Sequence, residues 1–429
     1  MKLYTKPDRK DWTAILKRPA MDAAALEPVV TNILNEVKVN GDEAVRKFSL
    51  MFDKTVLSKL ELEQDEIDFA ANALSEELKR AIHLAASNIG VFHKRQMEKE
   101  EFVETMPGVL CWRKSVPIDK VGLYIPGGTA PLFSTLLMLG IPAALAGCKE
   151  IILCSPPTTG GTIHPAILYA AKVAGITKVF RVGGVQAIGA MAYGTTSIPQ
   201  VYKIFGPGNQ YVTCAKQLIQ KAGIAIDIPA GPSEVAVYAD DSANPSFVAA
   251  DLLSQAEHGI DSQVMLVCIS PAIAEKVKQE IERQLENLPR KQIAVPALNN
   301  SKIILVKDEE QAMDLLNEYA PEHLILASNH ARELSGKVRN AGSVFLGHFS
   351  PESVGDYASG TNHTLPTNGY AKSYSGVSLD SFVKKITFQE LTKQGLMKIG
   401  KSVEYMAEAE GMDAHALAVR LRRESINNE

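Results

Sequence analysis

The chain has 429 residues, of which 46% are hydrophobic and 22% are charged, and its formal net charge is −4. This length and composition are typical of a globular protein with two or more domains. No run of lysine and arginine is dense enough for binding to a phosphate backbone, so we expect no nucleic-acid partner.

The N-terminal sequence MKLYTKPDRKDW lacks the apolar core of a signal peptide, and the five cysteines contain no CxxC pair. These features argue against export, a disulfide framework and a thiolate zinc site, so we expect a cytoplasmic protein with reduced cysteines. Residues 121–148 are uncharged. The prolines and glycines that interrupt this run predict a strand, a turn and a buried helix, and we expect no membrane span.

Apolar side chains recur at helical spacing from about residue 20 to about residue 100, as in AALEPVVTNILNEVKVN and LSEELKRAIHLAASNIG. From about residue 120 the pattern changes to short apolar runs that end in glycine and proline turns. These runs are VGLYIPGG, EIILCSPP, KVFRVGGVQ, YKIFGPGN and AIDIPAGPSEV, followed by a second set, QVMLVCI, KIILV, HLILAS and SVFLG. Such runs between helical stretches predict parallel strands joined by crossover helices.

We therefore predict an α/β protein with two incomplete Rossmann-like domains, each built on a parallel sheet, together with a helical N-terminal region and a helical C-terminal tail. The predicted ranges are 1–110 for the helical region, 111–240 and 241–386 for the two α/β domains, and 387–429 for the tail. Within the tail, Gly411 is expected to end one helix and Asp413 to cap the next.

Two glycine-rich turns, VGGVQ and GPGN, follow predicted strands. In open α/β sheets, ligands bind beyond the carboxyl ends of the strands. A strict GxGxxG fingerprint is absent, so these segments are also compatible with simple tight turns. Their position before predicted helix starts favours a cradle for the phosphates of a dinucleotide.

Polar side chains gather in five segments where a core would not be expected to hold them. They are Ser233 and Glu234 in PSEV, Gln255 and His258 in LLSQAEHG, Glu322 and His323 in YAPEHLILAS, Asp356 and His363 in GDYASGTNHTLPT, and Glu410 and His415 in AEGMDAHALAVRLRR. A single histidine is usually structural, but the number of such segments favours a functional site.

Gln255 and His258 are three positions apart, so a helix would present both on one face to a single ion, while Glu257 points elsewhere. Asp356 and His415 would supply the oxygen and the imidazole that complete a zinc site. The residues alone leave a zinc hydrolase and a non-catalytic metal-binding protein as alternatives.

A covalent mechanism is a further alternative. It would use Cys111, Cys148 or Cys154 as the nucleophile. No segment around these cysteines contains an activating histidine, which argues against this mechanism.

The segments LLSQAEHG, PEHLI, AGSVFLG, SPESVGDYASGTNHTLPT and AHALAVRLR occur in an order and at intervals that resemble the histidinol dehydrogenase family. The resemblance covers residues from about 121 to 422. It implies the oxidation of L-histidinol to L-histidine with two NAD, through an aldehyde that is not released, in the last two steps of histidine biosynthesis.

The resemblance also implies roles for individual residues. His323 is expected to be the base and proton shuttle, and Glu322 to activate the water that hydrates the aldehyde. Because these two residues are consecutive, they are expected at a turn or a strand end. One zinc ion per subunit is expected on Gln255, His258, Asp356 and His415.

The remaining expected contacts are to the substrate and to NAD. L-Histidinol is expected to contact Ser233, Gln255, His258, His323, Asp356, His363, Glu410 and His415. NAD is expected to contact Tyr124, Gln186 and Asn209. The resemblance further implies a homodimer in which the tail of each chain completes the active site of its partner.

Overall fold

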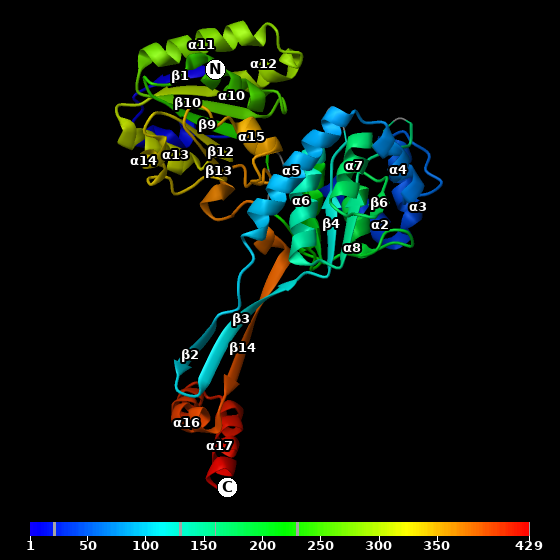
Figure 1. The fold of residues 1–429 in the computed structure, drawn as a ribbon, viewed down its shortest axis with the longest axis vertical. Helices are drawn as coiled ribbons and strands as arrows, with labels where there is room; N and C mark the ends of the chain where they lie inside the picture. The colour runs from blue at the N-terminus through cyan, green and yellow to red at the C-terminus, as the bar shows by residue number, and fades with distance from the viewer. Residues whose placement is uncertain (20–22, 128–130, 159, 229–230, 429) are drawn as a thin grey trace. The chain divides into compact units, whose positions relative to one another are not determined.

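The computed structural model describes residues 1–19, 23–127, 131–158, 160–228 and 231–428. The chain forms two units, of which unit 1 comprises Met1–Gln96 with Ile118–Phe382 and unit 2 comprises Met97–Pro117 with Val383–Glu429. Figure 1 labels most of their helices and strands. Among the described residues, no helix is both long enough and apolar enough to cross a membrane.

The first sheet of unit 1 is parallel and has the strand order β6-β5-β4-β7-β8. Its strands are β4 (Lys120–Tyr124), β5 (Glu150–Cys154), β6 (Lys178–Phe180), β7 (Lys203–Phe205) and β8 (Ala225–Ile226). The crossover helices are α6 (Phe133–Ala146), α7 (Pro165–Val173), α8 (Gly184–Tyr193) and α9 (Gln210–Gln220). The uncharged run 121–148 therefore contains a strand and a buried helix, as predicted, and residues 128–130 between them lie outside the described residues.

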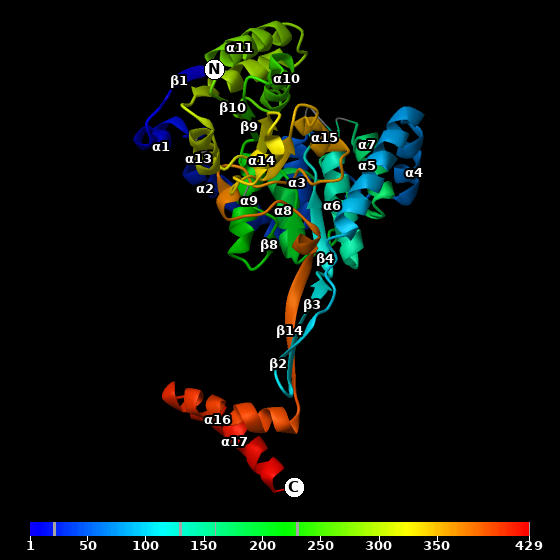
Figure 2. The same cartoon turned by 60° about the vertical axis from the view of Figure 1, so that its left-hand side comes forward.

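The predicted N-terminal helices pack on this first sheet. They are α2 (Ala23–Asn40), α3 (Asp42–Phe52), α4 (Gln64–Asn72) and α5 (Glu76–Lys94). Val37 of α2 shares one core with Ile188 of α8, and Ile89 of α5 shares another with Leu136 of α6. Helices α5 and α6 lie side by side in both views (Figures 1 and 2). The helical lead-in thus supplies part of the layers that bury the first sheet.

The second sheet of unit 1 is also parallel, with the order β1-β11-β10-β9-β12-β13. Its strands are β1 (Lys2–Thr5), β9 (Glu234–Ala239), β10 (Gln263–Cys268), β11 (Lys302–Leu305), β12 (His323–Ala327) and β13 (Ser343–Leu346). Its helices are α1 (Trp12–Ile15), α10 (Pro245–Ala256), α11 (Pro271–Leu285), α12 (Lys291–Asn299), α13 (Glu309–Tyr319), α14 (Ala331–Ser335) and α15 (Glu352–Tyr357). The strands place alternate side chains into two cores, one on each face.

Two strands depart from the predicted ranges in unit 1. The segment AIDIPAGPSEV was predicted as one run inside the range 111–240, but it contains β8 of the first sheet and the start of β9 of the second. Strand β1 lies in the range predicted as helical and pairs with β11. Both assignments depend on which strand pairs with which, and the local apolar pattern does not encode that.

Unit 2 contains an antiparallel sheet of order β14-β3-β2 and two helices. The strands are β2 (Phe102–Met106), β3 (Val109–Pro117) and β14 (Val383–Leu391), and the helices are α16 (Lys393–Ala409) and α17 (Asp413–Asn427). The prediction of helix was wrong for 102–110 and for 387–391. The ladder between β3 and β14 supports both segments, and Trp112 stacks on Phe388 with 5.3 Å between ring centroids.

Candidate active site

Glu322 and His323 lie at the amino end of β12, next to the first residue of β9. His323 begins β12 and Glu322 immediately precedes it, so the predicted strand end is confirmed. Both side chains are buried. The Glu234 N–H donates to the Glu322 carboxylate at 2.9 Å, and His323 Nδ1 donates to the Glu234 carbonyl oxygen at 3.3 Å. One residue of β9 therefore holds both side chains through its backbone.

Three buried carboxylates surround the His323 imidazole. Glu352 Oε1 and Glu322 Oε2 lie 3.7 and 3.8 Å from Nδ1, and Asp356 Oδ1 lies 3.4 Å from Nε2. Burial alone would lower the pKa of His323, but the three carboxylates raise it well above its ordinary value. Burial also raises the pKa of Glu322 to about 8. An imidazole held among carboxylates is suited to accepting and passing on a proton.

Glu352 is a member of this cluster that the sequence analysis did not single out. It lies four residues before Asp356 on α15, so both carboxylates project from one face of that helix. The i, i+4 spacing within SPESVGDY was visible in the sequence, but it is equally common on exposed helices. Only the burial of Glu352 distinguishes it from a surface residue.

His363 connects this cluster to the first sheet. Its Nδ1 lies 3.9 Å from Asp356 Oδ1, and its Nε2 lies 2.8 Å from the hydroxyl of Thr135. Thr135 is in the first turn of α6, which follows the carboxyl end of β4. Burial lowers the pKa of His363. The amino edge of the second sheet thus meets the carboxyl edge of the first sheet at this histidine.

Gln255 and His258 lie at the end of α10. Gln255 is in the last turn, fully buried, but the helix stops at Ala256 and His258 lies beyond it with an exposed side chain. The prediction that one helix carries both Gln255 and His258 was therefore wrong. The prediction that Glu257 is an ordinary helix residue was also wrong, because Glu257 is the C-cap. The turn continues through the cap, where the His258 N–H donates to the Gln255 carbonyl at 3.3 Å, and Gly259 follows.

The buried polar atoms of this region fit a divalent cation. Among the described residues, neither amide atom of Gln255 has a hydrogen-bond partner, and the same is true of Asp356 Oδ1 and His323 Nε2. Asp356 is also within electrostatic reach of His258. An amide oxygen, a carboxylate and imidazoles are donors that zinc accepts, and a cation would offset the excess of buried carboxylate charge.

A second combination of residues around Asp356 also has metal-ligand geometry. Ligand atoms of His323, Glu352 and Asp356 all lie within 4.8 Å of one another. This trio shares only Asp356 with the predicted set of Gln255, His258, Asp356 and His415. Asp356 is thus common to both arrangements.

Glu410 and His415 lie in unit 2, where both side chains are exposed. Glu410 is the C-cap of α16, and Gly411 follows it with φ +72°, in the left-handed conformation predicted for a helix stop. His415 is in the first turn of α17. The prediction that Asp413 caps this helix was wrong, because Met412 occupies the N-cap and Asp413 is the first helical residue.

The predicted NAD contacts all lie at or after the carboxyl ends of strands in the first sheet. Tyr124 ends β4, and its hydroxyl accepts the Gly184 N–H at 3.1 Å. Burial raises the pKa of Tyr124 to about 12. Gln186, on α8, is fully buried, and neither of its amide atoms has a partner among the described residues. Asn209 caps α9, where its side chain accepts the N–H groups of the helix's first turn at 3.1 Å.

Ser233 and the cysteines complete the predicted residues. Ser233 is half-buried directly before β9, and its carbonyl accepts the Gln263 N–H at 3.2 Å. Cys111, Cys148 and Cys154 are free thiols. Burial raises the pKa of Cys148 to about 11 and that of Cys154 further still, which disfavours a nucleophilic thiolate at either position.

Comparisons with known proteins place this arrangement in a family. A family model described as histidinol dehydrogenase matches residues 16–423. A histidinol dehydrogenase of Bacteroides fragilis is 61% identical over 99% of this chain and 100% of its own length, and one of Escherichia coli is 51% identical over 97% and 95%. The crystal structure of histidinol dehydrogenase from Elizabethkingia anophelis, 54% identical, covers 100% of this chain and 99% of its own with a TM-score of 0.98. The chain therefore belongs to the histidinol dehydrogenase family.

Proposed function

We propose that the protein oxidises L-histidinol to L-histidine in two steps, with NAD accepting both hydrides and the aldehyde remaining bound between them. The observation that carries this proposal is the buried His323 imidazole between Glu322 and Asp356 in a chain of this family. Family membership also weighs against the zinc hydrolase and the non-catalytic metal-binding protein, because the relatives are named as dehydrogenases.

In this proposal, zinc is held by Gln255, His258, Asp356 and the tail residue His415. When bound, zinc would act as a Lewis acid that fixes the amine and the imidazole of histidinol beside the nicotinamide of NAD. Further substrate contacts are assigned to Ser233, His363 and Glu410. Contacts to NAD are assigned to Tyr124, Gln186 and Asn209.

His323 takes the alcohol proton in the first oxidation. Its Nδ1–H donates to the Glu234 carbonyl oxygen, so in the neutral form of the ring Nε2 is the nitrogen that accepts that proton. As the O–H bond breaks, the carbinol carbon gives its hydride to NAD and the C–O bond becomes the carbonyl of the aldehyde. His323 then passes the proton to solvent.

Glu322 takes a proton from the water that adds to the aldehyde carbon. Burial raises its pKa to about 8, so the ionised form of this carboxylate is a stronger base than an ordinary glutamate and takes the proton more readily. The hydrated aldehyde then gives a hydride to a second NAD and a proton to His323. The product is the carboxylate of histidine, the protons held by Glu322 and His323 pass to solvent, and two NADH are formed per histidinol.

The direct test is incubation of the purified protein with L-histidinol and NAD, with and without a chelator. We expect two NADH per histidinol consumed and loss of turnover on removal of zinc. Products of hydrolysis without NADH would support the zinc hydrolase instead. Zinc binding without any turnover would support the non-catalytic alternative.

We also propose a cytoplasmic homodimer in which the tail of each chain completes the site of its partner. The test mixes a His323→Ala chain with a His415→Ala chain, each nearly inactive alone. In a mixed dimer, one active site then contains both substitutions and the other contains neither. Random pairing at equal amounts makes about half of the dimers mixed, so roughly a quarter of the original activity should return. No recovery after confirmed subunit exchange would mean that His415 serves its own chain.

A further inference from the structure

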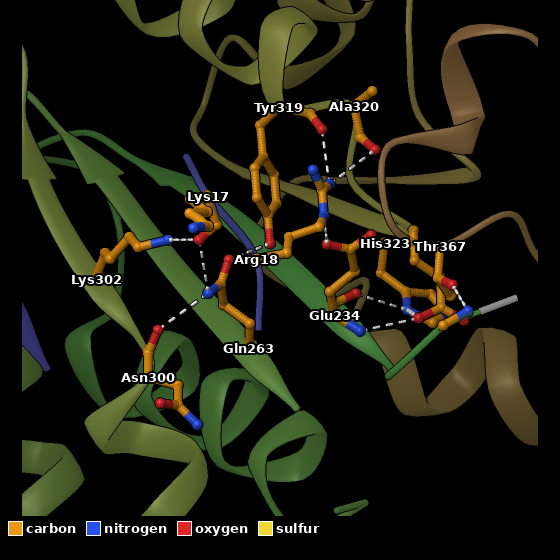
Figure 3. Close-up of polar contacts among 12 residues, drawn as sticks. Lys17, Arg18, Glu234, Gln263, Asn300, Lys302, Tyr319, Ala320, His323 and Thr367 are labelled. Atoms are coloured by element: carbon orange, nitrogen blue, oxygen red, sulfur yellow. Dashed lines mark hydrogen bonds and ion pairs between the residues drawn. The ribbon is translucent and has the colours of Figure 1, made fainter. Parts of the chain in front are cut away.

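A buried network leads from the N-terminal segment to the candidate active site. Arg18 Nε donates to Glu234 Oε2 at 2.6 Å, and Arg18 Nη2 donates to the carbonyl oxygens of Tyr319 and Ala320 at 2.7 and 3.4 Å. The guanidinium carbon also lies 3.9 Å from the centroid of the Tyr319 ring. Figure 3 shows Arg18 between that ring and Glu234. The side chains of Arg18 and Glu234 are only 16% and 2% exposed.

Arg18 binds the two segments that position Glu322 and His323. The first is the start of β9, where the backbone of Glu234 contacts both residues. The second is the turn that ends α13, because Tyr319 and Ala320 stand just before Pro321 and Glu322. The Arg18 guanidinium therefore connects the start of β9, whose backbone contacts Glu322 and His323, to the turn that leads into Glu322 and His323.

The turn at Ala320 has a backbone conformation that needs such support. Ala320 has φ +52°, in the left-handed region that residues with a Cβ adopt only at a cost. This residue sets the direction in which the chain enters Glu322 and β12. A hydrogen bond from Arg18 to each of the two carbonyls at the turn opposes relaxation towards a commoner conformation.

The N-terminal segment is fixed so that Arg18 reaches this position. Trp12, Ile15 and Leu16 are buried in the same core as Tyr319. The Lys17 carbonyl accepts a hydrogen bond from Lys302 Nζ at 2.8 Å, as Figure 3 shows. The backbone on the N-terminal side of Arg18 is thus anchored independently of the ion pair with Glu234.

The chemistry of this contact favours positioning over stability. A buried ion pair contributes little net stability, because the desolvation of both charges offsets their attraction. A guanidinium is, however, planar and directs several N–H groups at fixed angles, which lets it hold a carboxylate and carbonyls in one geometry. Lysine carries the same charge but lacks this planar arrangement of N–H groups.

We propose that Arg18 is a positioning residue for Glu322 and His323, and that the N-terminal segment delivers it to the amino edge of the second sheet. The inference rests on the proposed function, because it concerns the same two oxidations. Displacement of a reacting group by about 1 Å can lower the rate roughly 100-fold. Loss of the guanidinium hydrogen bonds of Arg18 should therefore lower kcat.

The test compares Arg18→Lys with Arg46→Lys. Arg46 is a matched control on α3, because it also binds two carbonyl oxygens, of Leu57 and Ser58 at 3.2 and 3.4 Å, and a carboxylate, of Asp42 at 3.8 Å. For Arg18→Lys we expect kcat with histidinol to fall roughly 10- to 100-fold, with the KM for NAD and the bound zinc within about twofold of the original values. Arg46→Lys should retain the original kcat.

Three results would overturn the inference. They are an unchanged kcat in Arg18→Lys, an equal fall in kcat in Arg46→Lys, and a rise in the KM for NAD that matches the fall in kcat. If Arg18→Lys does not fold, the double variant Arg18→Met/Glu234→Gln replaces it, because no unpaired buried charge remains. That variant should be folded with kcat reduced at least tenfold, and an original kcat there would also overturn the inference.

The unsubstituted enzyme separates this inference from the proposed function. If it forms no NADH from histidinol, the proposed function fails. If it forms NADH and Arg18→Lys is equally fast, only the role of Arg18 fails.

Discussion

The two sheets of unit 1 present their candidate site residues at opposite ends of their strands. In the first sheet, Tyr124 ends β4, and Gln186 and Asn209 follow the carboxyl ends of β6 and β7. In the second sheet, Glu234 and His323 begin β9 and β12, at the amino ends. The carboxyl edge offers helix N-termini and glycine turns, which suit phosphates. The amino edge offers buried carboxylates and an imidazole, which suit proton transfer and a cation.

Gln186 and Gln255 are matched residues that reflect the same difference between the two sheets. Both are fully buried on helices, and neither side chain has a hydrogen-bond partner among the described residues. Gln186 lies on α8 beside the first sheet, and Gln255 lies on α10 beside the second. An unpaired buried amide costs stability, so each is best explained by a ligand that it is kept to bind. The proposed function assigns NAD to the first and zinc to the second.

The largest expected effect is on kcat, and it comes from substitution of His323 at the amino edge of the second sheet. His323→Ala should lower kcat by roughly 1,000-fold for both histidinol and supplied histidinaldehyde, because the residue moves a proton in each oxidation. Steady-state assays with the two substrates measure this. His83→Ala, at an exposed position on α5, is the control and should leave both rates unchanged. A His323→Ala enzyme within tenfold of the original rate would contradict the assignment.

Substitution of Glu322 should affect the rates of the two oxidations differently. Glu322→Gln should lower aldehyde oxidation about 100-fold, since the water loses its base, and should lower the first hydride transfer less. Single-turnover measurement of NADH from each substrate resolves the two steps. Equal losses in both steps would show that Glu322 does not act chiefly on water.

A buried lysine, Lys302, and a half-buried lysine, Lys203, extend the comparison of the two sheets to stability. Lys302 and Lys203 begin β11 and β7, and each donates to a carbonyl oxygen at 2.8 Å. Burial lowers the pKa of Lys302 from 10.5 to about 8. Burial also lowers the pKa of Lys203, although Asp227 opposes this. Both lysines therefore carry a desolvation penalty that depends on pH.

The sign of the pH effect follows from the lowered pKa of Lys302. Between pH 8 and 10.5 the unfolded chain binds this proton and the folded chain does not, so stability should rise with pH. Relative to Lys302→Met, the unfolding free energy of the original protein should increase by about 2 kcal/mol between pH 8 and pH 10. Denaturant titrations measure it. A smaller rise is expected relative to Lys203→Met, and a fall with pH at Lys302 would contradict the account.

The smallest expected effect is on the stability of the protein without zinc or NAD. Gln186→Leu and Gln255→Leu should each raise the unfolding free energy by about 1 kcal/mol, because leucine needs no hydrogen bond in these positions. Melting temperatures of the chelator-treated protein measure this. Destabilisation by both substitutions would mean that the amides have structural partners.

Apart from β1, the strands of the two sheets of unit 1 could be predicted from sequence, because apolar runs such as QVMLVCI are bounded by turns. Which sheet a strand joins could not, and the start of β9 was placed with the first sheet for that reason. Strand β14, VKKITFQEL, is mostly exposed, so its pattern resembles that of a surface helix. Only its ladder with β3 makes it a strand.

For the candidate site, the residue types were more informative than their local structure. Gln255 and Glu322 were visible because polar groups stood among apolar residues. Glu352 could not be recognised, since its burial depends on the packing of α15 against α10 and on its contact with His323. Only the NAD contacts were expected at carboxyl strand ends. Glu322 and His323 were expected at a turn or a strand end, and the structure places them at the amino end of β12.

The central claim is that the two edges bind different ligands, and the matched glutamines test it most directly. Bound zinc and the dissociation constant for NADH would be measured on Gln186→Leu and Gln255→Leu side by side. We expect Gln186→Leu to weaken NADH binding roughly tenfold and to keep its zinc, and Gln255→Leu to lose zinc while binding NADH within about twofold of the original affinity. Loss of both ligands in both variants, or the reverse assignment, would contradict the division between the edges.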